Sequence, residues 1–160
     1  MLNSSQIDAY SENGYLAVEN VVSLAELEEL RRVTDEFVEK SRRVSENDDT
    51  FDLEPGHSPD SPKLRRLKHP VSRHPVYAKY ARHAGILDIV ESLLGPNLRF
   101  HNNKLNMKNP GHGSAVEWHQ DWAFYPHTND DLLEVGIALD DMTVENGALM
   151  VIPGSHQGKT

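Results

Sequence analysis

The sequence predicts an α+β protein in which helices come first and an antiparallel β-sandwich or barrel follows. In the first 95 residues, apolar side chains recur at helical spacing. From Pro96 onward, short apolar stretches are separated by turn-forming residues, such as Pro110 with Gly111 and the tripeptide at 145–147. A length of 160 residues suits one hydrophobic core. We therefore expect a single domain, mainly helical over residues 1–95 and stranded over residues 96–160.

The N-terminal stretch predicts a short helix over residues 3–14 that ends at Gly14. Its candidate N-caps are Asn3, Ser4 and Ser5. Residues 15–22 have the composition of a strand. A longer amphipathic helix begins at Leu24, because apolar residues share one face and charged residues the other. Its apolar face contains Leu24, Leu27, Leu30, Val33 and Phe37.

Residues 46–75 combine an acidic block, several prolines and a basic run, so we expect a loop there, either a functional flap or a disordered segment. Residues 75–95 predict a second amphipathic helix, with Pro75 at its start and Gly95 at its end. Short strands are expected after that helix. They cover residues 97–108, 115–121, 131–142 and 148–154.

Composition narrows the classes of function. The formal net charge of −9 argues against a nucleic-acid partner and against adsorption to anionic lipid. The absence of cysteine leaves histidine and carboxylate side chains as metal ligands. Neither a signal peptide nor an apolar run long enough for a membrane span is recognisable. We expect a cytoplasmic protein.

The stretch EWHQDWAFYPH, residues 117–127, contains a His-x-Asp pair, His119 and Asp121. On a strand, residues two apart point to the same face, so this pair can offer an imidazole nitrogen and a carboxylate oxygen to one point. One further histidine would complete the two-His-one-carboxylate triad that suits non-haem Fe(II). The ligand types also suit Zn or Mn, and taken alone such a pair is more often a polar part of a strand than a metal site.

The combination of WHQDWAFYP with the downstream NGALMVIPGSHQG resembles the phytanoyl-CoA dioxygenase family of Fe(II)- and 2-oxoglutarate-dependent oxygenases. The resemblance implies a cupin-like jelly roll, or double-stranded β-helix, with His119 and Asp121 as two iron ligands. It also implies 2-oxoglutarate as co-substrate, molecular oxygen as oxidant and hydroxylation of a small organic molecule. Iron held on one face leaves positions open for the keto acid and for oxygen.

The family's distal histidine ligand and its 2-oxoglutarate arginine fall after Thr160. The resemblance therefore implies that this sequence is the N-terminal part of a longer oxygenase and holds the first half of the jelly roll. By itself it would bind iron weakly through two ligands and would not turn over. For His156 we expect a structural or surface role rather than that of the third ligand.

Three further residues are candidates for contact with 2-oxoglutarate. Lys104 and Asn106 share one face of the expected strand at 97–108, where the alternative is a solvated outer face. Arg66 is the best candidate within the basic run, which otherwise reads as a solvated charge run. Aromatic residues near the pair can line a substrate pocket, although core packing is favoured for Trp118. These residues are Trp118, Trp122, Phe124 and Tyr125.

The remaining histidines have no partner at a ligand-like spacing, and we expect surface or hydrogen-bonded positions for them. They are His57, His69, His74, His83, His101, His112 and His127. Two other functions remain open. One is a non-catalytic jelly-roll binding module that lacks a third ligand. The other is a metal-dependent isomerase or hydrolase on a cupin-like barrel with Zn or Mn.

Overall fold

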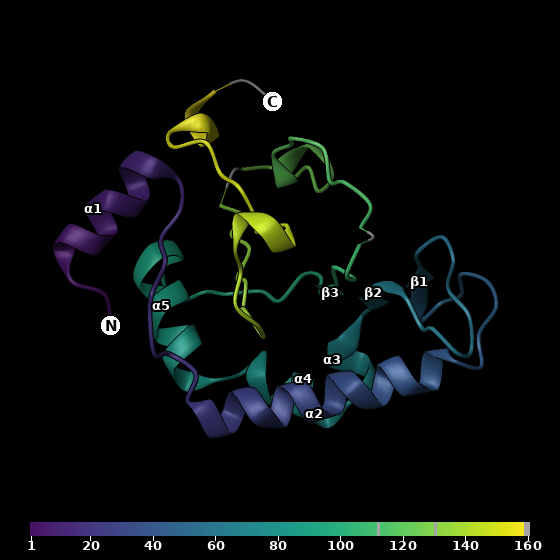
Figure 1. The fold of residues 1–160 in the computed structure, drawn as a ribbon. Helices are drawn as coiled ribbons and strands as arrows, with labels where there is room; N and C mark the ends of the chain where they lie inside the picture. Colours follow the sequence, from purple (N-terminus) through teal and green to yellow (C-terminus); the bar gives the residue numbers. More distant parts are fainter. Residues whose placement is uncertain (112, 130, 159–160) are drawn as a thin grey trace.

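A small antiparallel sheet packed on two helices forms the centre of the fold in the computed structural model (Figure 1). The structure describes residues 1–111, 113–129 and 131–158. Its helices are α1 (Ser4–Asn13), α2 (Leu24–Ser41), α3 (Pro70–Arg73), α4 (Pro75–Tyr80) and α5 (Ala84–Leu94). Its strands are β1 (Phe51–Leu53), β2 (Leu64–Lys68) and β3 (Lys104–Asn106). Three short 3-10 turns follow: η1 (Asp121–Ala123), η2 (Val144–Asn146) and η3 (Ser155–Gln157).

Each of the two N-terminal helices is preceded by a residue whose side chain caps it. Asn3 caps α1, and Gly14 ends it in the left-handed conformation with φ of 80°. At the start of α2, the Ser23 hydroxyl accepts from the backbone of Glu26 at 3.4 Å, and the Glu26 carboxylate accepts from the backbone of Ser23 at 2.9 Å. This reciprocal pair is a capping box. The predicted short helix and the predicted long helix are both confirmed.

The sheet has the order β1-β2-β3, and one of its faces supplies the core. Phe51 lies opposite Leu67, and Leu53 lies opposite Leu64. The buried cluster joins this face to α2 and α4. Its members are Leu30, Val33, Phe37, Phe51, Leu64, Leu67, Tyr77 and Tyr80. The expectation of a loop over residues 46–75 is therefore wrong, because this stretch supplies β1, β2 and α3.

Two other predicted elements differ from the structure. The helix expected over residues 75–95 is divided into α4 and α5. The chain turns at His83, whose ring stacks on Tyr80 with a centroid separation of 6.2 Å and accepts from the backbone of Ile86 to cap α5. The strand expected over residues 15–22 is not formed. Asn20 adopts a left-handed conformation with φ of 59°, which an extended strand does not accommodate.

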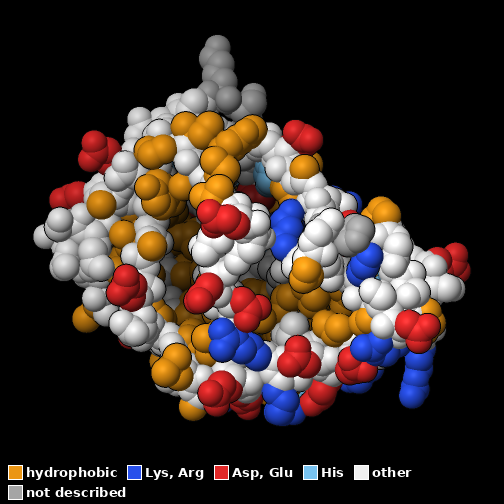
Figure 2. Space-filling view, viewed as in Figure 1, with side chains coloured by type: hydrophobic (Ala, Val, Ile, Leu, Met, Phe, Trp, Pro, Cys, Tyr) orange, Lys and Arg blue, Asp and Glu red, His pale blue; other side chains and the backbone are white. Residues whose placement is uncertain are grey.

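Beyond α5 the structure contains far less sheet than the sequence predicts. Only β3 forms within the strand expected at 97–108, and the described residues of the other three predicted segments are not in strands. None of the described residues in 96–158 is buried. Trp118, expected in the core, is 63% exposed. Figure 2 shows a hollow at the centre of one face of the molecule, with apolar side chains gathered around it.

Mixed helix and antiparallel sheet thus confirm the α+β class, whereas the jelly roll stays a prediction. Among the residues that the structure describes, no helix is long and apolar enough to cross a membrane.

Candidate active site

His119 and Asp121 lie side by side, as the i, i+2 spacing predicts, although the segment is not a strand. Gln120 between them is extended, with φ of −107° and ψ of 134°, and η1 begins at Asp121. The extended residue places both side chains on one side of the chain. His119 Nε2 lies 3.6 Å from Asp121 Oδ1, and the two side chains are 32% and 29% exposed. Both remain accessible to a ligand from solvent.

A backbone hydrogen bond fixes the orientation and the tautomer of the His119 ring. Its Nδ1 lies 2.6 Å from the backbone oxygen of Glu117. A carbonyl oxygen can only accept, so Nδ1 carries the proton and the lone pair of the neutral ring is on Nε2, beside Asp121. Metal-binding histidines commonly donate their second nitrogen to a carbonyl in this way. Two donor atoms that bind one ion at about 2.1 Å and at a right angle lie about 3 Å apart, so a small adjustment from 3.6 Å accommodates a metal.

A second carboxylate, that of Glu134, lies next to Asp121. Burial raises the pKa of Glu134, and the neighbouring Asp121 carboxylate raises it further. Lys104 opposes this shift, with Nζ 3.6 Å from Glu134 Oε1. Glu134 therefore connects the His119–Asp121 pair to Lys104 on β3. The Lys104 ammonium thus offsets part of the repulsion between the two carboxylates.

The polar face of the sheet carries the three candidates for 2-oxoglutarate contact. Arg66 on β2 lies opposite Asn106 on β3, and Arg66 Nε donates to Asn106 Oδ1 at 3.1 Å. Arg66 also lies 3.7 Å from Asp52. Lys104 is the next position on the same face, opposite Lys68. The structure thus brings Arg66, Asn106 and Lys104 together, and Lys104 connects them to the His119–Asp121 pair.

The aromatic residues around the pair differ in their contacts. Phe124 packs edge-on against His119, with ring centroids 5.2 Å apart, and covers one side of the imidazole. Trp122 donates from Nε1 to the Asn129 carbonyl at 3.0 Å and is half-buried. Tyr125 is half-buried beside the exposed His101, at a centroid distance of 5.4 Å. Of these ring contacts, that of Phe124 is made with the pair itself.

The other histidines lie away from the pair or serve the fold. His57, His74 and His83 are hydrogen-bonded to backbone groups, as expected. His156 contacts α1 through the Ser11 carbonyl at 3.1 Å. His112 lies outside the described residues. Within the described ranges, no group of three or more histidine and acidic side chains is arranged to hold a metal ion.

Residues 10–160 match the family model described as phytanoyl-CoA dioxygenase (PhyH). The chain belongs to the phytanoyl-CoA dioxygenase family. The match covers the His-x-Asp pair and the downstream PGSH stretch, and it confirms the resemblance inferred from them.

Two of the similar proteins are named as dioxygenases. A probable alpha-ketoglutarate-dependent hypophosphite dioxygenase of Stutzerimonas stutzeri is 37% identical over 150 residues, which cover 94% of this chain and 52% of that protein. An ectoine dioxygenase of Sphingopyxis alaskensis is 29% identical over 161 residues, which cover 98% of this chain and 50% of that protein. The chain therefore spans about half the length of these curated relatives.

A solved structure also matches. The crystal structure of EctD from S. alaskensis with bound Fe superposes with a TM-score of 0.66 and 25% identity. The superposition covers 78% of this chain and 42% of that chain.

One residue of the site was missed by sequence reasoning. Glu134 lies in a stretch read only as a strand, and its contact with Asp121 does not follow from local backbone geometry. No spacing or motif in the phytanoyl-CoA dioxygenase family resemblance singled it out. By contrast, His119 and Asp121 were identified because local backbone geometry alone brings them together.

Proposed function

We propose that this chain carries two iron ligands, His119 and Asp121, of an Fe(II)- and 2-oxoglutarate-dependent dioxygenase. The observation that carries the proposal is the pair itself: His119 has its Nε2 lone pair beside Asp121 at 3.6 Å, and its other nitrogen is held by Glu117. Family membership supports the choice of iron over Zn or Mn. The match to an Fe-bound structure further supports the choice of iron. The same matches support the proposal that residues 96–160 contribute to a jelly-roll core.

Bound iron and 2-oxoglutarate would supply the oxidising chemistry, and the chain's own residues would bind and orient. Lys104 is the favoured partner for a 2-oxoglutarate carboxylate, because its ammonium lies near Glu134, which neighbours Asp121. Asn106 and Arg66 are proposed to support it from the same sheet face. The Phe124 ring would keep water from one side of His119.

The proposed reaction is hydroxylation of a small organic molecule, in line with the ectoine dioxygenase relative. A second candidate is oxidation of a small phosphorus oxyanion. The 37% identity to a probable hypophosphite dioxygenase favours it. Comparing succinate formation from 2-oxoglutarate with ectoine and with hypophosphite separates the two.

The ligand assignment is tested with Co(II), which replaces Fe(II) without oxidising in air. In the complete protein, His119→Ala and Asp121→Ala should each weaken Co(II) binding at least tenfold by calorimetry, because each removes one ligand. Both should also abolish iron-dependent succinate formation. His69→Asn is the matched control: His69 is left-handed, with φ of 51°, and its side chain makes no cap hydrogen bond. Wild-type succinate formation by either ligand variant would refute the assignment.

A further inference from the structure

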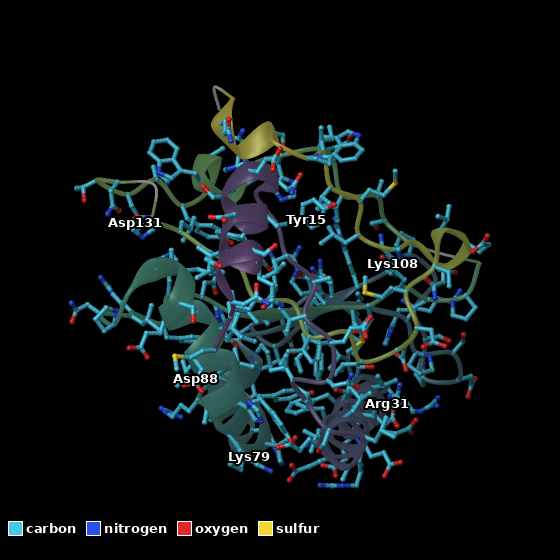
Figure 3. All side chains as sticks on the ribbon, turned by 90° about the vertical axis from the view of Figure 1, so that its left-hand side faces the viewer. Tyr15, Arg31, Lys79, Asp88, Lys108 and Asp131 are labelled. Carbon is cyan, nitrogen blue, oxygen red and sulfur yellow. The ribbon has the colours of Figure 1, made fainter. Side chains whose placement is uncertain are left out.

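Two stretches far apart in the sequence meet at the C-terminal end of α1. The last carbonyl groups of a helix have no partner within the helix. Here the turn at 154–157 supplies donors to them: Gly154 N donates to Asn13 O at 2.8 Å, and His156 Nε2 donates to Ser11 O at 3.1 Å. Figure 3 shows this turn, in yellow, directly above the end of α1. The turn is therefore docked on the helix end.

Gly14 makes this docking possible. Its φ of 80° is unfavourable for residues with a side chain. A Cβ at this position would also overlap the ring of His156, whose Cγ would lie only 2.6 Å away. The imidazole thus occupies the space that a side chain on residue 14 would fill. Gly14 and His156 are fitted to each other.

The docked turn also holds the residue between the two proposed ligands. Gln120 Nε2 donates to the backbone oxygen of Ser155 at 2.7 Å. Gln120 is half-buried, whereas His119 is exposed. A continuous series of hydrogen bonds therefore runs from the end of α1, through the turn at 154–157, to the peptide that carries His119 and Asp121.

We propose that Gln120 and His156 are positioning residues for the metal-binding pair. Gln120 fixes the extended peptide between the ligands, and His156 fixes the turn that holds Gln120. The inference rests on the proposed function of His119 and Asp121. Groups that orient metal ligands without touching the metal are known to change metal affinity. The bond from Gln120 restrains both ligands at once, since it acts on the residue that joins them.

The restraint that Gln120 and His156 place on the backbone is tested without metal. In His156→Ala, backbone amides of residues 117–122 should exchange with deuterium at least threefold faster than in the wild type, because the anchor of Gln120 is loosened. Gln120→Ala should do the same. Gln157→Ala is the matched control, since its amide reaches the carbonyls of Ser11 and Glu12 only at 3.5 Å. Unchanged exchange in both of the first two variants would overturn the inference.

The effect on the ligands is tested with Co(II) titrations followed by tryptophan fluorescence. The two tryptophans of the chain, Trp118 and Trp122, flank the pair and report on metal binding there. Gln120→Ala should raise the Kd for Co(II) about three- to tenfold, the worth of one hydrogen bond. His156→Ala should act in the same direction. His156→Gln keeps an N–H donor and should recover most of the affinity.

The outcomes separate the two proposals. Wild-type Co(II) affinity in Gln120→Ala and His156→Ala, together with its loss in His119→Ala, would overturn the positioning roles and leave the ligand assignment standing. Absence of Co(II) binding by the wild type would contradict the ligand assignment, and hydrogen exchange would still decide whether the turn restrains residues 117–122. Equal thermal stability of the apo-proteins is the control for unfolding.

Discussion

Glu54 is 4% exposed, and both of its carboxylate oxygens are hydrogen-bonded to one residue. Ser114 donates from its backbone nitrogen at 2.9 Å and from its hydroxyl at 2.7 Å. The Ser114 carbonyl accepts from Lys108 at 2.7 Å. Every polar group of Ser114 is therefore held, and Glu54 ties the hairpin of β1 and β2 to the segment that leads to His119.

These hydrogen bonds make the stability pH-dependent. They lower the pKa of Glu54 below its ordinary value, against the opposing effect of burial. A carboxyl group whose pKa is lower in the folded state stabilises the protein above its unfolded pKa. That stabilisation is lost as the pH falls through the folded pKa of Glu54.

Glu54→Gln removes the charge and should lower the free energy of unfolding by about 1–2 kcal/mol at pH 7. Urea titrations at pH 7 and near pH 3 measure the effect. The difference between variant and wild type should shrink as the pH falls, because protonation of wild-type Glu54 removes the same charge. Ser114→Ala tests the same contact from the other partner. The double variant should lose less free energy of unfolding than the sum of the two single variants, because both remove the same hydrogen bonds. A difference that grows toward low pH would contradict this account.

Among the elements, those with local signals were predictable and those that depend on long-range pairing were not. The capping residues Asn3 and Ser23 and the terminating Gly14 act within one helical turn, so α1 and α2 were predicted. The hairpin was missed because Leu64 and Leu67, three apart, do not alternate. The register shifts between Asp52 and Leu53, and this irregularity turns both leucines toward the core.

The missed strand β2 should be among the most sensitive elements. Leu67 is fully buried at 0% exposure and lies opposite Phe51. Leu67→Ala should lower the free energy of unfolding by about 3–5 kcal/mol, because the loss of buried surface is joined by a cavity. Chemical denaturation followed by circular dichroism measures it.

Leu149→Ala serves as the matched control, since Leu149 is 80% exposed and its change should stay within about 0.5 kcal/mol. Equal effects of the two substitutions would contradict the placement of the core in the hairpin.

At the scale of the whole molecule, burial is confined to one part of the chain. Every buried residue among those described lies between Leu30 and Ile86. The His119–Asp121 pair lies outside this part. Its support comes from three neighbouring contacts, namely Gln120 with the turn at 154–157, Ser114 with Glu54, and Glu134 with Lys104 on β3. The closeness of the two side chains could be predicted from sequence, whereas the contacts that support them could not, because each joins residues distant in the chain.

This distribution predicts graded hydrogen exchange. Amides in α2, α4 and β2 should exchange slowest, at rates set by global unfolding, and those of residues 131–152 should exchange much faster through local opening. Mass spectrometry of deuterated peptides distinguishes the two classes. Exchange of residues 135–152 as slow as that of α2 would show that the exposed apolar residues of this stretch are covered in solution.

The docking of the 154–157 turn on α1 also sets an order of events during synthesis. Ser11 and His156 are 145 positions apart, so the helix is made long before its partner. At about 5–20 residues per second, the α1 carbonyls wait about 7–30 s before His156 emerges. During that interval α2, the hairpin and α4 have already left the ribosome. The support of the proposed metal pair is thus completed only after the core has had time to form.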